Sequence, residues 1–186
     1  MMKRRGLRQS ANAALMAVLA LGVAACAADT PVSAPPCPEI LIPVDGAKLT
    51  RFKPGPGRDI IDVVHEELVT GFSHGCEYDT DTSGAGELLV ELIPSFEAKR
   101  GPANPGDQAQ FEYFIAIVDQ DKNLLEKKRF PTTIEFPSNM SRVLWQREDA
   151  ISMRIPLQAG QTGDDFQVFI GLQMTRDELE YQRRIR

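Results

Sequence analysis

The sequence predicts an all-β domain that ends in one short helix. Short segments in which apolar and polar residues alternate predict strands, and clusters of Gly, Pro and Asp between them predict turns. A helix-capping pattern close to the C-terminus predicts the helix. Residues 37–186, about 150 in number, are enough for one domain with its own core.

The first predicted strand covers residues 39–44 (EILIPV). Pro43 has no backbone N–H to donate to a neighbouring strand, so we expect this strand at the edge of a sheet. Residues 53–58 (KPGPGR) predict a break, because Gly and Pro both interrupt regular structure.

Residues 59–72 (DIIDVVHEELVTGF) fit two kinds of element. Apolar residues repeat at helical spacing at positions 60, 64 and 68, whereas positions 61, 63 and 69 fit the alternation of a strand. The segment is dense in β-branched residues and is interrupted by Gly71, which favours a strand. We therefore predict a strand here, with a helix as the open alternative.

The clearest strand pattern lies in residues 87–98. One face would carry the apolar side chains Leu88, Val90, Leu92 and Phe96. The opposite face would carry the polar side chains Glu87, Glu91, Ser95 and Glu97. This alternation predicts a strand with one face on the core.

The remaining strands follow in the second half of the chain. Residues 111–118 (FEYFIAIV) are apolar on both faces, which predicts a central strand. Residues 119–123 predict a hairpin turn, and residues 124–130 the returning strand. Residues 150–155 and 166–172 alternate again and predict two more strands.

The last element is predicted to be a helix over residues 176–184. Thr175 and Glu178 (TRDE) match a capping box, in which each side chain bonds a free backbone N–H of the first turn. Arg183 and Arg184 suit the negative end of the helix dipole. The helix could present its face to a partner, but we expect it to pack on the sheets.

Together these elements predict an antiparallel β-sandwich of about seven strands with a short C-terminal helix. An immunoglobulin-like or fibronectin-like topology is the first expectation, and a small barrel is the alternative. Trp145 does not lie between Cys37 and Cys76, so the Cys–Trp–Cys order of immunoglobulin domains is absent.

The N-terminal residues predict an export signal. A basic start, residues 3–8, precedes an uncharged apolar stretch at residues 11–25, which is shorter than the roughly 20 residues of a membrane span. Val23-Ala24-Ala25-Cys26 resembles the lipobox of bacterial lipoproteins. The resemblance implies that residues 1–25 are removed and that Cys26 carries the lipid; the alternative is an ordinary signal peptide that leaves a free thiol.

The resemblance also implies a location. Ala27 stands where lipoproteins of double-membrane bacteria need Asp to stay on the inner membrane, so we expect the periplasmic face of the outer membrane. Residues 26–36 would form a lipidated, Pro-rich tether that reaches about 30 Å. Residues 37–186 would form the domain. Several short motifs, Cys37-Pro38 and Arg100-Gly101-Pro102 among them, are similar to small lipoproteins of Gram-negative bacteria, which implies no particular activity.

The charge and the cysteines set further expectations. Removing residues 1–25 leaves 17 basic and 26 acidic residues, a net charge of −9 that argues against a nucleic-acid partner. The lipid would then provide the contact with the membrane. If Cys26 is lipidated, Cys37 and Cys76 remain, and an even pair in an oxidising compartment predicts a disulfide. A redox or metal-binding pair is the alternative.

The sequence contains few candidate residues for metal binding or catalysis. Asp79, Asp81 and Ser83, with Glu87 further on, resemble the opening of a calcium loop, but Val90 stands where the final bidentate Glu is needed. A polar hairpin loop is the other interpretation. His65 lies in a predicted strand and is expected to be structural. We therefore expect no enzymatic activity and no cofactor.

The predicted function is that of a membrane-tethered lipoprotein that binds another envelope protein or supports an assembly there. The anchor, the tether and the β-rich domain favour this interpretation. A small-ligand or calcium-binding envelope protein is the alternative.

Overall fold

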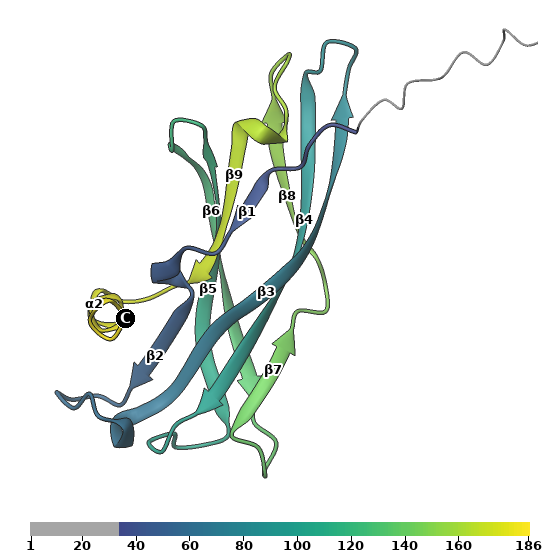
Figure 1. Ribbon diagram of the computed structural model, residues 1–186. Helices are drawn as coiled ribbons and strands as arrows, with labels where there is room; N and C mark the ends of the chain where they lie inside the picture. Colours follow the sequence, from purple (N-terminus) through teal and green to yellow (C-terminus); the bar gives the residue numbers. More distant parts are fainter. Residues whose placement is uncertain (1–33) are drawn as a thin grey trace, which may run out of the picture. The chain divides into compact units, whose positions relative to one another are not determined.

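The computed structural model describes residues 34–186, which form two β-sheets and one short C-terminal helix (Figure 1). The first sheet has four strands in the order β1 (Glu39–Leu41), β9 (Phe166–Leu172), β5 (Gln108–Asp119) and β6 (Leu124–Glu135). Its pairs are antiparallel except that of β1 with β9. The predicted all-β fold with a short C-terminal helix is confirmed.

The second sheet has five strands. Its order is β2 (Lys48–Phe52), β3 (Val63–Thr80), β4 (Gly86–Arg100) and β7 (Arg142–Gln146), and β8 (Ile151–Leu157) also pairs with β4. The two late strands share one side of β4, because β7 pairs with its second half and β8 with its first half. All pairs in this sheet are antiparallel.

The core lies between the two sheets. The predicted apolar face of β4 is fully buried, and it meets the inward face of β5. Phe96 of β4 contacts Phe111 and Tyr113 of β5, with ring centroids 5.4 and 4.9 Å apart. Glu97 lies on the opposite face but is also buried, since Arg142 and Lys99 pair with it.

The ambiguous segment at residues 59–72 is mainly a strand, as predicted. It begins with a short 3₁₀ turn, η2 (Ile60–Asp62), which the sequence pattern did not indicate. The strand β3 then continues to Thr80, where it forms a long hairpin with β4. The pairing register shifts between Val69 and Gly71, which is where the sequence interrupts the strand pattern.

Two strands were not predicted. Both β2 (KLTRF) and β7 (RVLWQ) are only five residues long and mix charged with apolar residues. In β7, Val143 and Trp145 pack against the core, but Leu144 between them is 73% exposed, so three successive apolar residues hide the alternation. Their pairing with long neighbours, rather than their own pattern, makes them strands.

The helix α2 (Arg176–Arg184) has the predicted bounds and the predicted capping box. It packs against β2, as expected, rather than standing free (Figure 1). The Tyr181 ring meets the Phe52 ring edge-on at 4.8 Å. Gln182 Nε2 donates to Thr50 Oγ1 at 2.9 Å, so a buried amide and a buried hydroxyl satisfy each other.

The predicted disulfide between Cys37 and Cys76 is present, with the Cα atoms 5.8 Å apart. It joins the first described residues to β3. Beside it, the Tyr78 hydroxyl donates to the Pro36 carbonyl at 2.5 Å and accepts from the Gly163 N–H at 2.6 Å. The start of the domain is therefore held by one covalent bond and two hydrogen bonds.

The predicted signal peptide at residues 1–25 and the lipidation of Cys26 lie outside the described residues, as does most of the tether. Within residues 34–186, no helix is long and apolar enough to cross a membrane.

Candidate functional site

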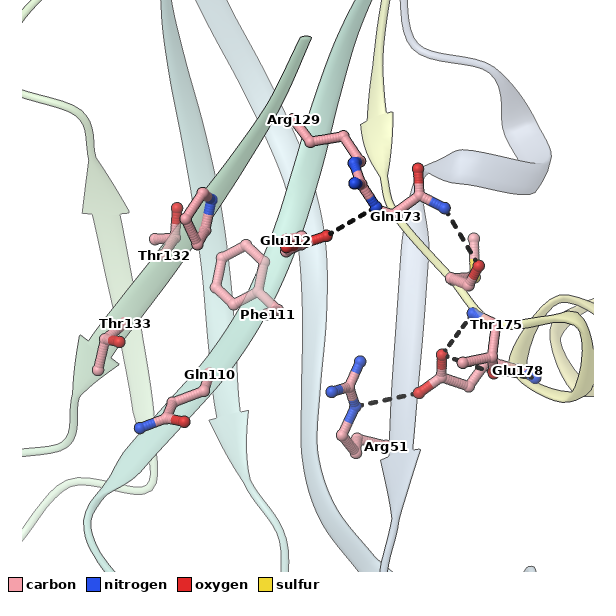
Figure 2. A pocket seen from close by; sticks show the side chains of 12 residues that line it. Arg51, Gln110, Phe111, Glu112, Arg129, Thr132, Thr133, Gln173, Thr175 and Glu178 are labelled. Carbon is pink, nitrogen blue, oxygen red and sulfur yellow. Dashed lines mark hydrogen bonds and ion pairs between the residues drawn. The ribbon is translucent and has the colours of Figure 1, made fainter.

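A groove of about 630 Å³ opens between β2, β5, β6 and the segment that leads into α2 (Figure 2). Phe111 lies at its inner side, where β5 faces the core. Gln110, Thr132, Thr133 and Gln173 supply neutral polar groups around it. With Arg51 of β2, the lining residues come from four separate parts of the chain, so the fold, and not a sequence motif, assembles the groove.

The groove exists because β9 is shorter than its neighbour β5. The ladder between them covers residues 113–119 of β5 and stops when Tyr113 pairs with Leu172. Beyond this point the chain turns away towards α2, and one further bond joins Gln173 N–H to the Glu112 carbonyl at 2.8 Å. Residues 108–112 of β5 therefore have a strand partner on the β6 side alone.

The charged groups of the groove are balanced. Arg51 Nε bonds Glu178 Oε1 at 3.0 Å, and the other carboxylate oxygen of Glu178 accepts from the backbone and side chain of Thr175. Arg129 lies 3.8 Å from the Glu112 carboxylate, and its side chain is 65% exposed. Two cations thus face two anions, and the groove carries no strong field of one sign.

A buried hydrogen-bonded pair, His65 and Glu67, lies on the inward face of β3, near the same end of the domain. His65 Nδ1 and Glu67 Oε1 are 2.5 Å apart, and both side chains are almost fully buried. Among the described residues, Glu67 Oε2 has no hydrogen-bond partner. Burial raises the pKa of the Glu67 carboxyl, and the hydrogen bond from His65 opposes that rise.

His65 also borders a second, smaller cavity of about 280 Å³ together with Asn104, Gln108 and Gln110. Its burial and its short contact with Glu67 fit the predicted structural role. His74, in contrast, is exposed and lies edge-on to the Phe72 ring, with centroids 5.7 Å apart. The two histidines are therefore in different surroundings and do not share a site.

The sequence contains one Gly-x-Ser-x-Gly, at residues 71–75, which the expectation of no enzymatic activity did not take into account. In hydrolases this motif forms a sharp turn between a strand and a helix. Here it lies within β3, and Ser73 pairs with Ile93 in the ladder to β4. The turn that would expose a nucleophile is thus missing from this segment.

The candidate calcium residues lie at the tip of the β3–β4 hairpin. Asp81 Oδ1 accepts from Ser83 N at 2.8 Å and Ser83 Oγ at 2.6 Å, and these bonds lower the pKa of Asp81. Asp79 stands opposite Glu87 in the ladder, and Glu87 pairs with Arg154 at 2.9 Å. Within residues 34–186, no group of three or more His, Cys, Asp or Glu side chains could hold a metal ion. The bonds from Ser83 to Asp81 are of the kind found in polar hairpin loops.

The sequence matches no known family model and no curated protein. Among solved structures, the chain has a weak likeness to the variable (V) domain of the AgI/II polypeptide BspA of Streptococcus agalactiae. The likeness covers 71% of this chain and 75% of that chain, with 10% sequence identity and a TM-score of 0.16. A TM-score this low supports no conclusion about fold or function.

The residues of the groove were not among the predicted site residues. Arg51 lies in a strand that was not predicted, and Gln110 precedes the predicted start of the central strand. One signal was present: the capping box at Thr175 ends β9 soon after Leu172. A long central strand beside a strand that must end early leaves part of an edge unpaired.

Proposed function

We propose that this protein is a lipid-tethered envelope lipoprotein whose domain binds another protein and has no enzymatic activity. The lipobox-like residues before Cys26 support lipidation, and Ala27 supports the periplasmic face of the outer membrane. Residues 26–36 would then act as the tether between the membrane and the domain. The membrane contact would come from the lipid, because a mature chain with a net charge of −9 has no electrostatic attraction to anionic lipid.

The groove beside β5 carries the binding part of this proposal. The groove is concave and lined mainly by polar side chains, with Phe111 on its inner side and Gln110, Thr132 and Gln173 around it. Polar groups of this kind can form hydrogen bonds with the backbone and side chains of a protein partner. Its balanced charges favour a protein partner over a polyanion.

A photo-cross-linking amino acid placed at Thr132 tests the proposal in intact cells. We expect it to capture one envelope protein, and we expect that protein to bind the purified chain directly. The matched control is Leu125, which is exposed on the same strand but away from the groove. If positions 132 and 125 recover the same background proteins and no partner binds in solution, the proposal is wrong.

The finer classification of the fold as immunoglobulin-like or fibronectin-like belongs to the same proposal. Two mainly antiparallel sheets that share one core support it. An experimentally determined structure, compared strand by strand with both families, tests it. A strand order that differs from the orders found in both families would contradict this classification.

A further inference from the structure

The backbone of Gln110 points into the groove. On either side of it, the Glu112 carbonyl accepts from Gln173 N–H at 2.8 Å and the Gln108 carbonyl accepts from Asn104 Nδ2 at 3.0 Å. Neither donor belongs to β6, so both carbonyls face away from that strand. Residues two apart in a strand direct their backbone groups to the same side, and therefore the N–H and C=O of Gln110 face away from β6 as well.

A proline in β6 supports the same direction independently. Pro131 stands opposite Glu112 in the antiparallel ladder and has no N–H to donate. Opposed residues alternate between hydrogen-bonded and non-hydrogen-bonded pairs, so a proline fits the second kind. The pair of Gln110 with Thr133, two residues along, is then also non-hydrogen-bonded. The polar backbone groups of Gln110 are thus free of the β6 ladder.

This open stretch lacks the protection that exposed strand edges usually have. Proteins guard such edges with charged residues and proline. The outer strand β6 is guarded in this way, since it carries Lys127, Lys128, Arg129 and Pro131. Of the β5 residues that line the groove, Gln110 and Phe111 carry no charge, none is a proline, and the charge of Glu112 is paired with Arg129. The outer edge of β6 is thus protected against pairing with another strand, whereas this stretch of β5 in the groove is not. This difference is expected of an edge that binds another segment.

We propose that the groove binds an extended, uncharged segment of the partner protein, which adds a strand to β5 and pairs with the backbone of Gln110. This proposal rests on the proposed function and names the part of the partner that is recognised. Addition of a strand to an open sheet edge is a common way in which domains bind peptides. The two ion pairs of the groove leave no unpaired charge there that would select a strongly charged segment.

The geometry also indicates the pattern of the segment. Because the Gln108 and Glu112 carbonyls already accept from Asn104 and Gln173, an added strand would pair with the backbone of Gln110 alone, which needs about three residues, or about 10 Å. Its residue opposite Phe111 would face the core and should be apolar. Its neighbours opposite Gln110 and Glu112 would face outward and should be polar. The expected segment is therefore a short stretch of alternating apolar and uncharged polar residues.

A synthetic probe tests this proposal with the purified full chain. The probe is a capped peptide of alternating Thr and Val, about seven residues long, and its binding is followed by the NMR signals of backbone amides. We expect saturable binding with a Kd below about 1 mM, and slower hydrogen exchange at the Gln110 amide. A Kd above this range for the unaltered chain, or unchanged exchange at Gln110, would overturn the proposal.

Two proline variants distinguish an effect on binding at the open edge of β5 from a general effect of proline on folding. Gln110→Pro removes an N–H that faces the groove, and Lys127→Pro removes one that faces outward from β6, on the same side as Pro131. Losing the one hydrogen bond that the Gln110 N–H would donate should weaken probe binding about fivefold in Gln110→Pro, because the carbonyl at this position remains. Lys127→Pro, and Gln110→Ala with its intact N–H, should bind within about twofold of the unaltered chain. Equal binding by Gln110→Pro and Lys127→Pro would contradict the proposal.

Two other outcomes can be told apart. If the Gln110 amide is protected without the probe and the chain forms concentration-dependent dimers, the occupant is a second copy and the proposal is wrong. If Thr132 cross-links a partner in cells but Gln110→Pro does not weaken that partner's binding, the proposed function stands and the strand-addition proposal fails.

Discussion

At the residue scale, the carboxyl of Glu67 is fully buried, so its surroundings differ strongly from water. It lies on the core side of β3 with one oxygen bonded to His65 and the other without a partner among the described residues. A buried carboxylate with an unsatisfied oxygen is costly. Protonation is then the simplest way to lower that cost, and this is why burial raises the pKa of Glu67.

Glu67→Gln should remove one component of the pH dependence of stability. Since the pKa of Glu67 is raised on folding, its favourable contribution is complete below about pH 4.5, its unfolded value, and is lost as the pH rises through the raised pKa. We expect the unaltered chain to lose stability relative to Glu67→Gln over that rise.

Urea unfolding of both chains across this pH range measures the difference. The comparison is needed because carboxyls such as Glu97 have lowered pKa values, through the bond from Arg142, and act in the opposite direction. A stability difference that does not change with pH would contradict the assignment.

At the scale of elements, most of what was predicted correctly depends on local pattern. The strand at residues 87–98 and the helix at residues 176–184 were predictable, because alternation and capping act over a few neighbouring residues. The strand β2 was not predictable from KLTRF, since its pairing with β3 and its cover by α2 lie far away in sequence. The groove was missed for the same reason.

Thr175→Ala should weaken the attachment of α2. The Thr175 side chain accepts from the Glu178 N–H at the start of the helix, and loss of such a cap costs about 1 kcal/mol. We expect a lower urea midpoint and faster hydrogen exchange in α2. Thr175→Ser keeps the hydroxyl and is the control; equal stability of all three chains would show that the cap contributes nothing.

At the scale of the whole molecule, the disulfide and the proposed lipid act on the same end of the domain. The bond between Cys37 and Cys76 ties the first described residues to β3, directly after the segment proposed as the tether. A force on the tether would therefore be transmitted to β3 through this disulfide.

Replacing both Cys37 and Cys76 by Ala should lower the free energy of unfolding by up to about 4 kcal/mol, because the bond closes a long loop in the unfolded chain. Urea unfolding with and without a reducing agent measures this. The double variant should not respond to the reducing agent. Equal unfolding of the oxidised and reduced native sequence would contradict a stabilising role.

Cys26→Ala should abolish labelling of the protein by a clickable palmitate analogue and release the domain from the membrane or block its maturation. Cys37→Ala is the matched control, because it removes a cysteine but keeps the lipobox-like residues, and its labelling should persist. Labelling of Cys26→Ala would overturn the proposed lipidation.

The sequence by itself determined the β-rich class, the position of the C-terminal helix and the pairing of Cys37 with Cys76, since alternation, capping and cysteine count are read directly along the chain. Only the tertiary structure decided that β9 leaves β5 at Tyr113, that Gln110 faces a groove and that Glu67 is buried. These features depend on the length of the ladder between strands that are distant in sequence, and on which elements pack over the ends of those strands. Such contacts leave no local pattern in the residues that form them.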